Sequence, residues 1–122
     1  MTAACASWRL LMPVARLRQA VQCVGALFSA TPSISLTFAA NRVVVEAFDA
    51  PGLTAAYPCE AHHDAPARFR IGFNGVYLMS LLNALRGPDM VMTGGESHDP
   101  VTLRDPADDN FTAIVMPMRV TQ

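Results

Sequence analysis

Histidine, serine and aspartate side chains occur together at two places in the chain, where they could hold a metal ion or act in catalysis. Residues 62–64 read His-His-Asp and residues 97–99 read Ser-His-Asp. A metal at the first run needs a third ligand from His98 or Asp99, because adjacent histidines point in different directions. Three consecutive residues cannot converge as a catalytic triad. We therefore predict a solvated loop at 62–64 and a turn at 97–99, and keep a hydrolase or metal enzyme only as an alternative.

The remaining charged residues do not indicate catalysis either. All nine basic residues are arginines, which excludes a lysine nucleophile and a phosphate-loop lysine. Asp105, Asp108 and Asp109 supply too few oxygen ligands for calcium, so we predict a solvated turn there. The chain also lacks the glycine-rich dinucleotide, nucleophile-elbow and zinc-protease signatures. These features favour a protein that is not an enzyme and has no metal or cofactor.

Length and composition indicate one packed domain over residues 1–122. The chain has a formal charge of −1, with 52% hydrophobic and 16% charged residues, which suits a globule with one core. Three widely spaced cysteines, Cys5, Cys23 and Cys59, favour a reducing compartment over a disulfide framework. Arginines near the N-terminus argue against a secretory signal, and the uncharged stretch 19–41 is too polar for a membrane span. We therefore expect a cytoplasmic protein with no membrane partner.

Hydrophobic periodicity predicts a first half at about residues 8–60. Its one helix is expected to begin at Val14, after Pro13, and to close at Thr31-Pro32. Its strands are expected at residues 8–12, 33–38, 43–48 and 53–60. A polar loop at 61–66 should separate this half from the second.

The second half, at about residues 67–119, repeats the same order of elements. Asn74 is expected to cap its helix. The apolar stripe of that helix should face the core and consists of Tyr77, Leu78, Leu81, Leu82 and Leu85. Strands are expected at residues 69–71, 90–93, 100–104 and 111–118. Two βαβββ halves predict an α+β fold, with both helices packed on one face of antiparallel sheet and their polar faces outward.

Three arginines lie off the apolar stripes of the two predicted helices. Arg16, Arg18 and Arg86 would form a modest cationic face that can slide along a phosphate backbone without reading bases. The alternative, left open here, is that they are ordinary solvated arginines.

The run from Ile114 to Met118 is strongly apolar and contains Pro117. Proline within a strand marks an edge or the strand's end, so part of this run should lack a sheet partner. Two methionines beside a proline form an adaptable apolar surface that suits a short peptide. A last core strand with its methionines packed inside is the alternative.

Two segments together resemble the third, C-terminal domain of bacterial sliding clamps, the beta subunits of DNA polymerase III. Residues 71–85 read IGFNGVYLMSLLNAL and resemble the clamp's IGFN-x-x-YL…L-x-AL helix. Residues 100–106 (PVTLRDP) and 114–119 (IVMPMR) resemble its SPV-x-I…(I/V)(V/L)MPMRL ending. Residues 11–60 match more loosely.

The resemblance implies a DNA-clamp-like domain whose helices face a central DNA channel and whose sheets form the outer surface. It places the third domain's share of a peptide pocket at Pro100, Ile114, Val115, Met116, Pro117, Met118 and Arg119. A clamp chain has three such domains, and the second-domain wall of the pocket has no counterpart here. The basic residues that the family places before the domain's first helix also have no clear match.

We therefore predict a non-enzymatic clamp homologue, a replication processivity-factor-like domain. It would assemble head to tail into a ring of six around double-stranded DNA, with Arg16, Arg18 and Arg86 facing phosphates, and would bind clamp-binding peptides of polymerase or repair proteins. The alternative is a monomeric or dimeric decoy or regulator of replication proteins that binds the same peptides and does not encircle DNA.

Overall fold

The chain forms two helices and nine strands in the part that the computed structural model describes, residues 7–26, 28, 33–50 and 53–118. The first half contains β1 (Trp8–Pro13), α1 (Val14–Gly25), β2 (Ile34–Ala39), β3 (Arg42–Ala50) and β4 (Leu53–Glu60). The short β5 (His62–His63) follows. The second half contains β6 (Arg70–Phe73), α2 (Gly75–Ala84), β7 (Asp89–Gly94), β8 (Val101–Asp105) and β9 (Asp108–Val115). This order confirms the predicted α+β class and the repeated βαβββ arrangement.

The strands form two antiparallel sheets, and each sheet takes strands from both halves. One sheet has the order β5-β1-β7-β8-β9 and the other the order β4-β3-β2-β6. β1 therefore leaves its own half to pair with β7, in register from Trp8↔Gly94 to Pro13↔Asp89. In the same way, β6 pairs with β2 of the first half. The division into two sheets goes beyond the prediction, which treated the strands as one antiparallel layer.

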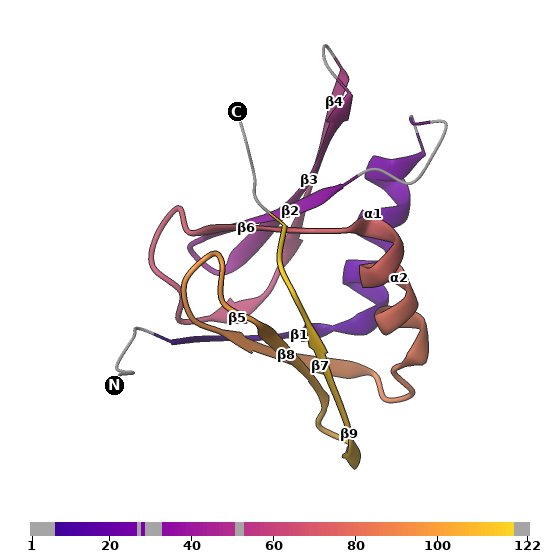
Figure 1. Cartoon of the computed structure of the whole chain (residues 1–122), viewed down its shortest axis with the longest axis vertical. Coiled ribbons are helices and arrows are strands. Elements are labelled where there is room, and N and C mark those ends of the chain that lie inside the picture. Colours follow the sequence, from indigo (N-terminus) through magenta and orange to yellow (C-terminus); the bar gives the residue numbers. More distant parts are fainter. Residues whose placement is uncertain (1–6, 27, 29–32, 51–52, 119–122) are drawn as a thin grey trace.

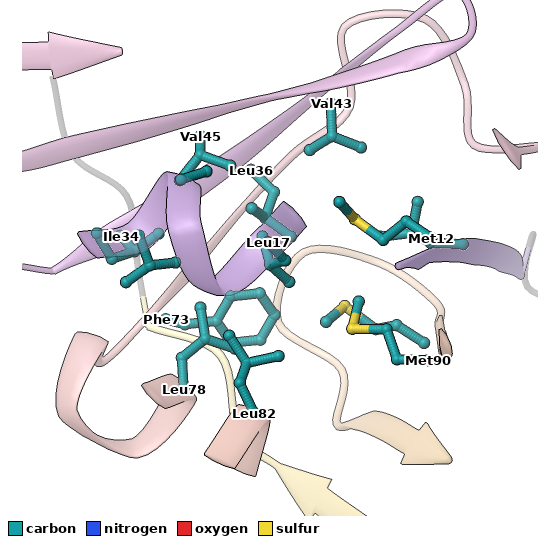
Figure 2. Packing of buried hydrophobic residues seen from close by; sticks show 14 of the residues in the cluster. Met12, Leu17, Ile34, Leu36, Val43, Val45, Phe73, Leu78, Leu82 and Met90 are labelled. Carbon is teal, nitrogen blue, oxygen red and sulfur yellow. The ribbon is translucent and has the colours of Figure 1, made fainter. Parts of the chain in front are cut away.

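The two helices lie side by side on one side of the molecule, and α1 packs on β3 and β4 while α2 contacts α1 and β9 (Figure 1). The buried stripe of α1 consists of Val14, Leu17, Ala20, Val21 and Val24. Leu78 and Leu82 supply the buried stripe of α2. Figure 2 shows side chains from both helices and both sheets converging on one interior.

Aromatic side chains close one end of this interior and join the two sheets. Trp8 of β1 packs on Phe38 of β2, with ring centroids 5.1 Å apart, and Phe69 lies 5.7 Å from both rings. The indole Nε1–H of Trp8 donates to the Gly95 carbonyl at 2.9 Å, so the polar edge of this buried ring is satisfied. Gly94 has to be glycine, because a Cβ there would lie 2.8 Å from the Trp8 ring.

The predicted boundaries differ most from the structure at three places. α1 ends at Gly25, where glycine weakens the helix, and Thr31-Pro32 lies outside the described residues. Two residues of the predicted polar loop at 61–66 form β5, which pairs with β1. β9 begins at Asp108, after a turn that the Asp105 carboxylate tightens by accepting the Ala107 N–H at 2.9 Å. It ends at Val115, two residues before Pro117, rather than at Met118.

Leu10 and Leu11, adjacent residues of β1, can be used to test which face of the strand packs in the core and contributes to the free energy of unfolding. Leu10 is fully buried and Leu11 is 38% exposed. We expect Leu10→Ala to lower the free energy of unfolding by about 2–5 kcal/mol, because it leaves a cavity in the core. Leu11→Ala, the matched control, should cost about 0.5 kcal/mol. Urea denaturation followed by far-UV circular dichroism measures both, and equal losses would contradict the assigned face.

Candidate functional site

An apolar groove of about 440 Å³ lies between α2 and the end of β9. Its lining residues, none of them charged, are Tyr77, Ser80, Leu81, Ile114, Val115 and Met116. Three large side chains are mostly exposed here, Tyr77 at 63%, Ile114 at 68% and Met116 at 62%. Exposed apolar side chains gathered at one place on a surface are typical of a binding site.

The α2 wall of the groove is positioned by the helix cap. Asn74 Oδ1 accepts the N–H groups of Val76 at 2.9 Å and Tyr77 at 3.2 Å, as the sequence predicts for an N-cap. Tyr77 therefore lies in the first turn of a well-defined helix, one turn before Leu81. The prediction that Tyr77 faces the core is wrong, as is the prediction that the outward face of α2 is polar. Val76 and Tyr77 point outward, because α1 and β9 pack on other sides of α2 and leave this side uncovered.

The β9 wall is held from both ends. On one side Val115 pairs with Val101 of β8. On the other, the Met118 N–H donates to the Gly72 carbonyl of β6 at 2.7 Å, and the Ser33 hydroxyl lies 3.8 Å from the Met118 sulfur. The chain between these anchors crosses from one sheet to the other, with Met116 in the middle. Its backbone is therefore restrained while its side chain remains exposed.

The groove brings together some of the residues predicted for peptide binding. Ile114, Val115 and Met116 line it, and Pro117 and Met118 continue the same wall. Pro100 is exposed and directly precedes Val101, but it does not line the groove. Arg119 lies outside the described residues.

Sequence reasoning missed the contribution of α2 to the groove. Tyr77, Ser80 and Leu81 line it, and no residue of this helix was included in the predicted site. The available signal was composition: α2 reads GVYLMSLLNA, so apolar residues surround almost the whole helix and exceed what one buried stripe needs.

The three arginines predicted to face DNA differ in their surroundings. Residues two positions apart on a helix point in widely different directions, so Arg16 and Arg18 lie on opposite flanks of α1. Arg18 is half-buried, and its Nη2 donates to the Leu82 carbonyl near the end of α2 at 2.9 Å. Arg18 thus joins the two helices, whereas Arg16 and Arg86 are exposed. Arg86 follows the end of α2 at Ala84, so the prediction that it lies on the second helix is wrong. Neither helix contains an acidic residue, so the helical layer is positively charged overall.

Arg16 borders a second, mixed groove of about 530 Å³ at the start of α1. Acidic and basic groups share this groove, with Glu60 and Asp89 beside Arg16 and His62. The carbonyl of Arg16 accepts the Cys59 thiol at 3.8 Å. Burial raises the pKa of that thiol, and the positive charge of Arg16 offsets part of this effect.

The histidine and serine runs form no catalytic centre within residues 7–118 as described. His63 is structural, because its Nε2 lies 2.6 Å from the Ala39 carbonyl and its Nδ1 accepts the Ala65 N–H at 3.1 Å. Residues 96–99 form a turn in which the Asp99 carboxylate accepts the Glu96 N–H at 2.8 Å. The described residues gather no group of three metal-ligating side chains, and neither of their helices is long and apolar enough to cross a membrane.

Comparison with known proteins gives one consistent result. A family model described as the DNA polymerase III beta subunit, C-terminal domain, matches residues 7–119. No curated protein matches the chain. Among solved structures, the pol III beta of Caulobacter crescentus is 23% identical with a TM-score of 0.86, over 98% of this chain and 32% of that chain.

Two further solved structures are similar and contain a ligand. The DnaN sliding clamp of Bartonella birtlesii bound to griselimycin is 21% identical with a TM-score of 0.84, over 93% of this chain and 30% of that chain. The corresponding clamp of Pseudomonas aeruginosa bound to griselimycin is 19% identical with a TM-score of 0.82, over 98% of this chain and 32% of that chain. The chain therefore spans about a third of the length of the clamp chains that it matches.

Asp105 is buried, so the prediction of a fully solvated acidic turn is wrong for this residue. Its carboxylate accepts the Gly87 N–H and the Ala107 N–H, both at 2.9 Å, and so joins the segment after α2 to the β8–β9 turn. Hydrogen bonds from the backbone of Gly87, Ala107 and Arg86 lower the pKa of Asp105, against the smaller opposing effect of burial.

We expect this carboxylate to contribute stability that depends on pH. A lowered pKa in the folded state means that the contribution is present above the unfolded pKa of about 3.9 and is lost as the pH falls through the folded value. Asp105→Asn should therefore lower the urea midpoint at pH 7, and its difference from the unaltered protein should shrink at acidic pH. The exposed Asp109→Asn is the control. A difference that persists unchanged at low pH would contradict this role.

Proposed function

Because this chain belongs to the family defined by the C-terminal domain of the DNA polymerase III beta subunit, we propose that it is a non-enzymatic sliding-clamp domain that binds clamp-binding peptides in the groove between α2 and β9. The observation that carries this proposal is the uncharged groove with Tyr77, Ile114 and Met116 exposed around it. Family membership confirms the resemblance stated above, while the peptide role is an inference from the groove.

The composition of the groove favours an apolar peptide segment as its ligand. Tyr77 offers a rigid apolar surface and Met116 an adaptable one. The hydroxyl groups of Tyr77 and Ser80 can hydrogen-bond to the backbone of a bound peptide and so orient it. Binding would cover side chains that the described part of the chain leaves exposed. A groove walled by one domain removes less apolar area from water than a pocket walled by two, so we expect this domain on its own to bind the peptide with weaker affinity.

The solved clamps bound to griselimycin provide a ready probe for this groove. The structures named above do not place that ligand on this chain. Griselimycin and a labelled clamp-binding peptide of a polymerase therefore serve as two independent ligands in the same titration, and competition between them would indicate one shared site.

Replacing groove residues should weaken peptide binding without unfolding the domain. Tyr77→Ala and Met116→Ala each remove an exposed apolar side chain, so we expect affinity for the labelled peptide to fall about tenfold. Fluorescence anisotropy measures the affinity, and circular dichroism confirms the fold. Leu11→Ala, which removes an exposed leucine outside this groove, is the matched control and should bind normally. Equal binding by all four proteins, or no binding by any, would contradict the proposal.

Ring assembly is a second candidate function, favoured by the sheet edges. Within the described residues, β4 ends one sheet and β9 ends the other, and each is eight residues long with one unpaired side. Unpaired strand edges hydrogen-bond readily to another chain. Since β4 and β9 are different surfaces, their pairing between copies would be head to tail and could close into a ring of six.

In such a ring, α1 and α2 would face double-stranded DNA. Arg16 and Arg86 are exposed and would face phosphates, which makes binding insensitive to base sequence and sensitive to salt. Arg18 has a hydrogen bond to Leu82, so its part in DNA contact would be indirect unless that bond opens. The alternative function is a monomeric or dimeric decoy or regulator that uses the groove and never encircles DNA.

The mass in solution separates the ring from the regulator. If the edges pair head to tail, light scattering on a sizing column should find a species near six times 13.1 kDa that persists on dilution. A monomer or dimer at every concentration would contradict the ring and leave the peptide-binding regulator as the function. The groove variants should leave this mass unchanged, because Tyr77 and Met116 lie outside both edge strands, β4 and β9.

A further inference from the structure

The methionines among the described residues range from fully buried to mostly exposed. Met90 and Met92 of β7 are fully buried, and Met12 of β1 is 1% exposed. Met116, in contrast, is 62% exposed. A thioether is oxidised by peroxide only where the oxidant can reach the sulfur, so burial protects the core methionines and leaves Met116 accessible.

Met116 also differs from its neighbour Met118. The Met118 sulfur lies 3.8 Å from the Ser33 hydroxyl, and the Met118 N–H is bonded to Gly72. Met118 is 38% exposed, less than Met116, so peroxide should reach its sulfur less readily. Met116 stands between these anchors with its side chain in the groove, where none of the lining residues carries a charge.

We propose that Met116 is a site of reversible methionine oxidation that switches off the groove. In this reaction a lone pair of the Met116 sulfur attacks one oxygen of hydrogen peroxide. The O–O bond breaks and an S–O bond forms. The thioether is oxidised by two electrons to the sulfoxide, and the peroxide is reduced to water. A thiol-dependent methionine sulfoxide reductase restores the thioether: the S–O bond breaks, two thiols are oxidised to a disulfide, and the oxygen leaves as water.

The sulfoxide changes the groove because it replaces an apolar, flexible group by a strongly polar one. A peptide that covers Met116 would have to bury the S–O dipole next to Tyr77 and Ile114, where no lining side chain besides the Tyr77 and Ser80 hydroxyls offers a donor. This consequence rests on the proposed function, whereas the selectivity of the oxidation does not.

The first measurement is the rate of oxidation at each methionine of the folded protein. Limited hydrogen peroxide, followed by trypsin and tandem mass spectrometry, reports Met116 and Met118 in the peptide 105–119 and the buried pair in the peptide 87–104. We expect Met116 to oxidise about tenfold faster than Met90 and Met92, with Met118 between them. Equal rates would overturn the proposal.

The second measurement compares peptide affinity before and after peroxide for three proteins. For the unaltered protein and for Met118→Leu, oxidation should weaken binding of the labelled peptide by at least about fivefold, and reductase treatment should restore it. For Met116→Leu the ratio of affinities should stay near one, whatever its starting affinity. A loss of the same size in Met116→Leu would overturn the switch, because another residue would then be responsible.

The outcomes also separate this inference from the proposed function. If untreated protein binds the peptide and the selectively oxidised protein binds equally well, the switch is wrong and the proposed function stands. If untreated protein binds neither the peptide nor griselimycin, the proposed function fails and the switch fails with it. Selective oxidation of Met116 together with a reversible loss of binding supports both.

Discussion

The domain depends on an exchange of strands between its two halves, in which one strand of each half pairs with a strand of the other half. β1 pairs with β7 of the second half, and β6 pairs with β2 of the first. Backbone N–H and C=O groups of a buried strand must find partners, so neither half can complete its sheet alone. Trp8 and Phe38 then pack across the two sheets that result. The exchange therefore joins two small repeats into one cooperative core, which a half of this size could hardly form by itself.

The same exchange determines where the groove lies. β6 leads directly into Asn74 and α2, and Gly72 of β6 accepts the N–H of Met118. The first turn of α2 and the end of β9 are consequently held on either side of one strand. The groove between them is shaped by backbone connections, and walls restrained in this way lose little conformational freedom on binding.

Local patterns predicted most helices and strands, because hydrophobic periodicity reports which face of an element is buried. They could not predict the two sheets, since alternation identifies a buried face and not the partner strand. Tyr77 was wrongly predicted to face the core because α2 is apolar on nearly all sides. The sequence therefore does not show which of its apolar residues belong to the buried stripe. Arg18 looked solvated because only the tertiary structure brings the Leu82 carbonyl within its reach. β5 was missed because two histidines carry no strand signal of their own.

The pairing of β1 with β7 has a consequence for how the chain is made. Trp8 Nε1 and the Gly95 carbonyl that it contacts are separated by 87 residues. Contacts of such long range slow folding, because a large loop must close before they form. During synthesis, β1 leaves the ribosome before β7 and waits several seconds for it, at about 5–20 residues per second. Throughout that interval the edge of β1 that pairs with β7 is open to chaperones and to aggregation.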